Sequence, residues 1–234
     1  MECFLNKSQW SKNVINKLKN LIELEKEAYL ELMAVARQEA YIYFDKNIRE
    51  LPRKKEGSFD ESTGEMSNND ADAFRHAYVS GVFTQEKGEI KANLAGIYNE
   101  MKGKNPINQQ NMDLWNNSVG RKYGKKSKTR EELADFIKKA LENNELIIKP
   151  NDPREYKGLR HFDYDPEKPV KVIQESESGR NQYFLDCSTG DILDRETFVT
   201  AIESGNYPGY TLSTIDNIKT PMSKPDKVTS NNLG

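Results

Sequence analysis

The sequence has little of what would assign it to a disulfide-rich, zinc-binding or membrane-spanning class. Its two cysteines, Cys3 and Cys187, are too far apart in sequence for zinc-ligand spacing and too few for a disulfide framework. No apolar run approaches the roughly 20 residues that cross a bilayer, so no integral membrane segment is expected. The formal net charge is −2, which excludes a strong overall attraction to nucleic acid. Contact with nucleic acid through a local basic patch stays open.

The N-terminus also lacks the pattern of a secretion signal. Residues 1–7 contain no apolar core followed by small residues. The chain is therefore expected to be cytoplasmic as synthesised. Action outside the cell would need a specialised secretion system or a carrier protein.

The first half of the chain has helical spacing. Between Ser11 and Glu50, apolar residues recur on one face among lysines and glutamates, with almost no glycine or proline. This predicts one long amphipathic helix, broken at most once, that ends before Pro52. Capping residues, glycines and prolines then divide the following residues into four more helices. Their expected ranges are 67–87, 89–101, 106–123 and 129–142.

After about residue 145 the sequence changes to short apolar runs separated by turn residues. Strands are expected at 146–148, 170–173, 183–185 and 210–218, with a short helix at 195–204. The predicted fold class is α+β. A mainly helical N-terminal domain of about five helices, residues 1–150, precedes a small mixed α/β module with a polar C-terminal tail, residues 151–234.

Two of the expected helices carry polar residues beside their apolar ones. Asp72 and His76 are four residues apart, as are Asp113 and Asn117, so each pair lies on one face of its helix. Two polar stripes can be buried only if they face each other or a ligand. This predicts a site between the second, third and fourth helices.

The residue types at this site allow three interpretations. Asp72 and His76 could share a divalent ion, to which Asp113 and Glu100 would add oxygen atoms. Alternatively, His76 is a base oriented by Asp72 without a metal. The third interpretation is a buried hydrogen-bond network that holds the helices in register. The predicted catalytic residues are His76, Asp72, Glu100 and Asp113.

Three further residues are candidates for substrate binding: Arg75, Asn117 and Arg121. The arginines suit a phosphate or a carboxylate. The alternative is that each arginine pairs with a neighbouring carboxylate of its own helix. Asn117 stands in a helix interior, where asparagine is unfavourable, so a local role for it is expected.

Two motifs resemble a poorly characterised bacterial helical domain, over roughly residues 68–145. Asp72-Ala-Phe-Arg-His-Ala is similar to its Asp-Ala-x-Arg-His-Ala, and Met112-Asp-Leu-Trp-Asn-Asn-Ser-Val-Gly-Arg to its Met-Asp-x-x-Asn-Asn-x-x-Gly-Arg. That domain occurs in large surface, wall-associated and polymorphic-toxin-like proteins. Its His-Glu pair at a helix end corresponds here to Asn99-Glu100, so only Glu100 carries over.

A second likeness covers residues 180–234. The stretch Gly190-Asp-Ile-Leu-Asp-Arg-Glu-Thr-Phe and the ending Ser230-Asn-Asn-Leu-Gly resemble a small uncharacterised bacterial module. The likeness implies an accessory or recognition role.

Two functions from different classes follow. The resemblance implies a bacterial toxin-type effector, and the polar residues suggest that it is a hydrolase. Its partners would be a cognate immunity protein or a secretion carrier. The alternative is a non-enzymatic adaptor, immunity or surface-associated module, in which the long N-terminal helix binds a partner.

Overall fold

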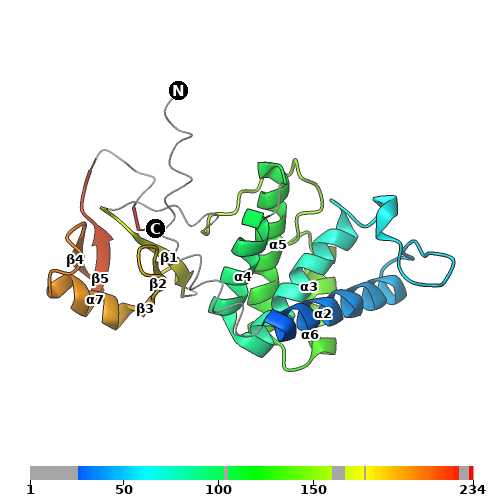
Figure 1. Ribbon diagram of the computed structural model, residues 1–234, viewed down its shortest axis with the longest axis horizontal. Coiled ribbons are helices and arrows are strands. Elements are labelled where there is room, and N and C mark those ends of the chain that lie inside the picture. Colours follow the sequence, from blue (N-terminus) through cyan, green and yellow to red (C-terminus); the bar gives the residue numbers. More distant parts are fainter. Residues whose placement is uncertain (1–25, 103–104, 160–166, 177, 227–231, 234) are drawn as a thin grey trace. The chain divides into compact units, whose positions relative to one another are not determined.

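The computed structural model describes residues 26–102, 105–159, 167–176, 178–226 and 232–233. The described residues form two compact units, which divide along the chain between Lys157 and Gly158. Helices make up the first unit, and small antiparallel sheets with one helix make up the second (Figure 1). The predicted α+β class, with a helical N-terminal part, is therefore confirmed. Among the described helices, none combines the length and the hydropathy that a bilayer crossing requires.

The helical unit contains the five helices α2 Lys26–Asn47, α3 Asp70–Lys87, α4 Glu89–Lys102, α5 Ile107–Lys126 and α6 Arg130–Glu142. Residues 11–25, the first part of the predicted long helix, lie outside the described residues. The N-cap of α3 is Asn69, whose side chain accepts from the amides of Ala71 and Asp72. Thr129 caps α6 as expected from its sequence.

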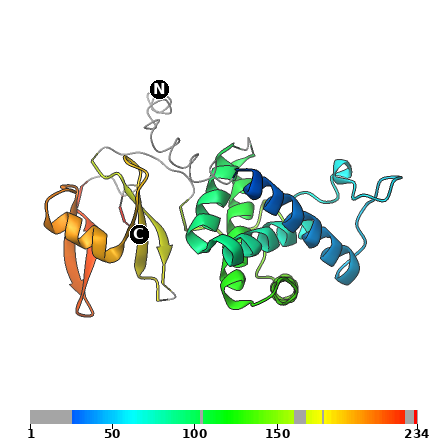
Figure 2. The same ribbon diagram turned by 60° about the horizontal axis from the view of Figure 1, so that its bottom comes forward.

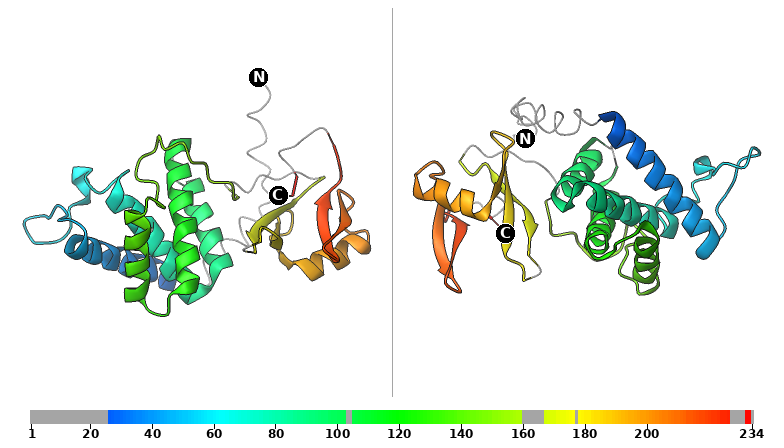
Figure 3. Two further views of the ribbon diagram at one scale, coloured as in Figure 1. Left: turned by 180° about the vertical axis from the view of Figure 1, so that it is seen from behind. Right: turned by 90° about the horizontal axis from the view of Figure 1, so that it is seen from below.

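The helices α3 and α5 lie side by side (Figure 1, Figure 3). A Cβ atom on Gly120 would lie 2.0 Å from the carbonyl oxygen of Ala77, and one on Gly124 would lie 2.5 Å from that of Gly81. The two backbones can therefore touch only because both α5 positions are glycine. Ala77 faces Gly120 and Gly81 faces Gly124, so the two helices run in the same direction. The helix α4, which connects them in the chain, runs in the opposite direction.

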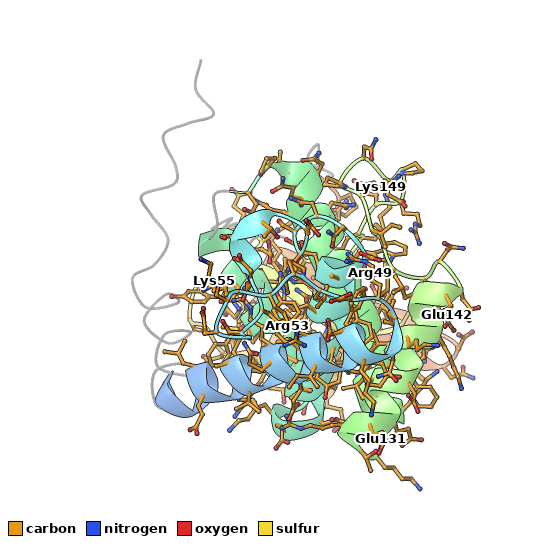
Figure 4. All side chains as sticks on the ribbon, turned by 90° about the vertical axis from the view of Figure 1, so that its right-hand side faces the viewer. Arg49, Arg53, Lys55, Glu131, Glu142 and Lys149 are labelled. Atoms are coloured by element: carbon orange, nitrogen blue, oxygen red, sulfur yellow. The ribbon has the colours of Figure 1, made fainter. Side chains whose placement is uncertain are left out.

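The core of the helical unit lies where α2 and α6 pack against α3 (Figure 2). The rings of Phe44 and Phe74, both fully buried, meet edge to face at 5.6 Å. From α6, Leu133 and Ile137 enter the same core. Glu131 and Glu142, near the two ends of α6, mark its course in Figure 4.

Residues 146–148 do not form the predicted strand. Leu146 and Ile147 are apolar because they pack into the helical core from a loop. The side chain of Asn116 donates to the carbonyl of Ile147 at 2.8 Å and accepts from its amide at 2.9 Å. One asparagine thus satisfies both backbone groups that a neighbouring strand would have paired.

The segment between α2 and α3 is tied to both helices. Arg53 pairs with Asp45 at 2.7 Å, and Arg49 pairs with Asp70. Figure 4 labels both arginines. A short 3-10 helix, η1 Glu61–Thr63, lies within this segment.

The second unit contains the antiparallel sheet β1 Val170–Glu175, β2 Asn181–Asp186 and β3 Ile192–Asp194, then α7 Arg195–Glu203 and the hairpin β4 Tyr210–Ile215 with β5 Ile218–Ser223. The single strand predicted at 210–218 is therefore wrong. Asp216 and Asn217 both have positive φ, so they form a two-residue turn that reverses the chain. The core residues of this unit are Val170, Phe184, Phe198 and Tyr210.

Candidate functional site

Three helices bring four of the predicted residues together. Asp72 is in the first turn of α3, Asp113 in the second turn of α5, and Glu100 in the last turn of α4. The carboxylates meet because α4 runs opposite to the parallel pair α3 and α5. All three residues are buried, with 5–7% of their surface exposed. His76, one turn after Asp72, completes the cluster.

Three possible ligand atoms of this cluster lie close together. His76 Nε2 lies 3.3 Å from Asp113 Oδ1 and 3.7 Å from Asp72 Oδ1. All three ligand atoms lie within 4.8 Å of one another. Metal–ligand bonds of about 2.0–2.4 Å place ligand atoms of one ion roughly 3–4 Å apart. The spacing of these atoms in Asp72, His76 and Asp113 therefore suits a divalent ion.

His76 is neutral in this environment. Its Nε2 lies 2.8 Å from Arg75 Nη2, and because a guanidinium only donates hydrogen bonds, Nε2 must accept. Burial, followed by the charge of Arg75, lowers the pKa of His76 to about 3. Asn117 holds the imidazole through a further hydrogen bond. Neutral imidazole is the form that binds metals.

The guanidinium of Arg75 supplies the positive charge at two of the three possible ligand atoms. Its Nη2 donates both to His76 Nε2 and to Asp72 Oδ1. Burial by itself would raise the pKa of Asp72, but the charge of Arg75 and the amide of Asn68, 2.8 Å away, keep that pKa below its usual value. A metal ion bound by Asp72 and His76 would compete with Arg75 for both side chains.

Asp113 and Glu100 form a carboxyl pair. Burial and the nearby charge of Glu100 raise the pKa of Asp113 to about 8, and burial raises the pKa of Glu100 to about 7. The charge of Glu100 disfavours the ionised form of Asp113, because two neighbouring buried carboxylates repel each other. Asp113 Oδ1 and Glu100 Oε2 are buried and have no hydrogen-bond partner among the described residues. The cluster is therefore incomplete as a purely structural network.

Asn117 lies between α4 and the imidazole. A Cβ atom on Gly96 of α4 would lie 3.2 Å from Nδ2 of Asn117, so the glycine leaves room for the side-chain amide of Asn117. Asn99 stands where the resembling domain has histidine. It donates to the hydroxyl of Tyr29 at 3.0 Å and thus faces α2, which leaves Glu100 as the contribution of α4 to the cluster.

Arg121 is buried, and its described hydrogen bond goes to a residue outside the cluster. Its Nη2 donates to the hydroxyl of Tyr156 at 3.4 Å. No ion pair joins it to Asp113 in the described part of the chain. Substrate binding by Arg121 stays a prediction.

Sequence reasoning missed Arg37 on α2. Met33, Arg37 and Tyr41 follow one another at intervals of four residues, on one face of that helix. Met33 contacts Asn99 of α4, and Arg37 pairs with Glu61 of η1. After burial and Arg75, the charge of Arg37 also contributes to the low pKa of His76. The available signal was an arginine within an otherwise apolar face.

Residues 42–145 match the model of a family described as a domain of unknown function (DUF6973). The match covers less than half of the chain. It includes residues 42–47 of α2, all of α3 to α6 and every residue predicted for the site, whereas Arg37 precedes it. No curated protein and no solved structure matches the chain. The helical unit thus contains an uncharacterised helical domain.

Proposed function

We propose that the helical unit is a metal-dependent hydrolase that acts as a bacterial toxin-type effector. The observation that supports the hydrolase is the convergence of Asp72, His76 and Asp113 on one point, beside the incompletely bonded Glu100. The toxin context is supported by the resemblance of the two motifs. Export by a specialised secretion system and a cognate immunity protein belong to the same proposal.

Glu100 provides the acid–base group of the cluster, because Asp113 is ionised when it holds the metal. A bound divalent ion would polarise a water molecule and a substrate oxygen. As the water oxygen bonds to the electrophilic atom of the substrate, the ionised carboxylate of Glu100 accepts a proton from the water. The bond to the leaving group breaks, and Glu100 donates that proton to the leaving oxygen. Glu100 is ionised at the end of the reaction, as it was at the start.

Metal binding is tested by thermal unfolding with magnesium, calcium, manganese and zinc. One of them should raise the melting temperature, since an ion at 100 times its dissociation constant adds about 2.7 kcal/mol to stability. His76→Ala should lose this increase. The matched control is Asp186→Asn in the second unit, where the buried carboxylate already accepts from Ser188 and Tyr207; its response to metal should equal that of the wild type. No increase with any of the four ions would contradict the metal site.

The toxin function is tested by expression in bacteria, in the cytoplasm and with export to the periplasm. Wild-type protein should arrest growth in one of the two compartments, whereas folded His76→Ala protein should not. The compartment in which growth stops would also locate the target. Equal growth with both proteins in both compartments would contradict the toxin proposal.

One observation favours the adaptor as a second candidate. Val35 and Ile42, seven residues apart on α2, are 45% and 58% exposed and share one helix face. Replacement of both by serine should leave the effect on growth unchanged if the helical unit acts as an enzyme. Loss of that effect, with His76→Ala still active, would instead identify an adaptor.

A further inference from the structure

Four buried atoms without hydrogen-bond partners lie in or beside the cluster, and they are of two chemical kinds. Asp113 Oδ1 and Glu100 Oε2 are acceptors, while the Nε atoms of Arg75 and Arg37 are donors. A buried polar atom without a partner has lost its hydrogen bonds to water. The two acceptors suit a cation, and the two guanidinium donors suit an anion.

The position of Arg37 on α2 relates it to the cluster. One turn before it, Met33 contacts Asn99, the neighbour of Glu100. One turn after it, Tyr41 contributes to the raised pKa of Arg75 on α3. Arg37 therefore lies on the face of α2 that is turned toward α3 and α4, and its guanidinium carbon is 5.8 Å from the ring centre of Tyr41.

We propose that the substrate of this site carries a phosphoryl group, whose oxygens accept hydrogen bonds from Arg37 and Arg75. This inference rests on the proposed hydrolase site. A phosphoryl group offers several charged oxygens, enough for two guanidinium groups and a divalent ion together. A carboxylate has only two oxygens, and a neutral ester lacks the charge that favours pairing with arginine.

Glu61 competes with such an anion. Its carboxylate pairs with Arg37, and its Oε2 accepts from the hydroxyl of Tyr41 at 3.4 Å. Both Arg37 and Glu61 are about 40% exposed, with 42% and 39%, so solvent weakens this pair and an anion can replace it. Removal of the Glu61 charge should therefore strengthen binding of the anion by Arg37.

The test measures the affinity of the full chain for inorganic phosphate, with and without the divalent ion that stabilises it. Arg37→Gln should weaken phosphate binding by about tenfold or more, as expected from the loss of a hydrogen bond to a charged group. Arg37→Lys keeps the charge but lacks the Nε donor, so its phosphate affinity should lie between those of the wild type and Arg37→Gln. Glu61→Gln should bind phosphate more tightly than wild type. Dimethyl phosphate and acetate, used in further titrations, separate a diester from a monoester and a phosphoryl group from a carboxylate.

The matched control is Arg53→Gln. Arg53 is 45% exposed and pairs with Asp45, much as Arg37 pairs with Glu61, so its replacement should leave phosphate affinity unchanged. Equal affinity in wild type and Arg37→Gln, stronger binding of acetate, or no phosphate binding in either metal state would overturn the inference. Phosphate binding that depends on Arg37 but shows no effect of metal would support the anion site and contradict only the metal site.

Discussion

Asn116 and Asn117 are neighbours on α5 and both are buried, but they belong to two different polar regions. Asn116 exchanges two hydrogen bonds with the backbone of Ile147, so that region is complete without a ligand. Asn117 reaches the imidazole of His76, in a region where the nearby Asp113 retains an unpaired oxygen. Complete hydrogen bonding indicates a structural role, whereas incomplete bonding in a buried site indicates a binding role.

Two carboxylates show the same contrast. Asp45 accepts from the amide of Leu51 at 2.7 Å and from Arg53 at 2.7 Å, and these contacts outweigh burial and lower its pKa. For Asp113, burial and Glu100 raise the pKa. The protein thus stabilises the ionised form of Asp45. The ionised form of Asp113 is disfavoured and would need an additional positive charge, such as that of a bound cation.

The largest expected effect comes from the packing that brings the incomplete cluster together. Gly120→Ala would place a Cβ atom 2.0 Å from the carbonyl oxygen of Ala77, and α3 and α5 would have to separate. A loss of about 3 kcal/mol or more is expected, at the upper end for overpacking. Chemical denaturation measures it. Gly96→Ala, with a nearest contact of 3.2 Å to a side chain, is the control and should cost much less.

The next effect separates binding from stability. Asp113→Asn removes a buried group whose charge is disfavoured, so the protein without metal should keep its stability. It should lose the metal-induced stabilisation, about 2.7 kcal/mol at 100 times the dissociation constant. Melting temperatures with and without the ion give both numbers. Unfolding of the metal-free variant would show that Asp113 is structural.

The reverse outcome is expected for the complete region. Asn116→Ala leaves the amide and the carbonyl of Ile147 unpaired in the interior, which should cost about 2 kcal/mol. Its response to metal should remain that of the wild type, because Asn116 does not face the cluster. Calorimetric unfolding, with and without metal, checks both points. A variant that loses the metal response while keeping its stability would reverse the assignment.

The smallest effect concerns Asp45 and depends on pH. Because its pKa is lowered in the folded protein, its ionised form contributes stability above the unfolded pKa of about 4. That contribution is lost as the pH falls through the folded pKa. Asp45→Asn should therefore cost roughly 0.5–1 kcal/mol at pH 7, after allowance for solvent, and progressively less as the pH falls below about 4. A difference that does not depend on pH would contradict this account.

Local sequence signals were sufficient for the helices and for part of the site. Glycines, prolines and capping residues predicted the ends of α3, α4 and α6 to within a few residues, because helix ends depend on nearby backbone groups. The spacing of four residues placed Asp72 and His76 on one face of α3, since helix geometry alone determines that relation. The same reasoning applies to Asp113 and Asn117 on α5.

Relations between distant residues required the tertiary structure. The apolar run at 146–148 has the composition of a strand, yet it packs as a loop because Asn116, more than 25 residues earlier, satisfies its backbone. The sequence also does not distinguish Asn116 from Asn117, since adjacent helical residues differ in direction by about 100° and only packing decides which direction is toward the site.

The α+β class, the ends of α3, α4 and α6, and the polar faces of α3 and α5 depend on spacing and composition, so they can be predicted from the sequence. Which of these faces meet depends on how the helices pack. Gly120 brings α3 against α5 through backbone contact, Glu100 arrives from an antiparallel helix, and Arg37 from a fourth helix. The unpaired atoms that motivate both proposals exist only once these helices have excluded water from around them.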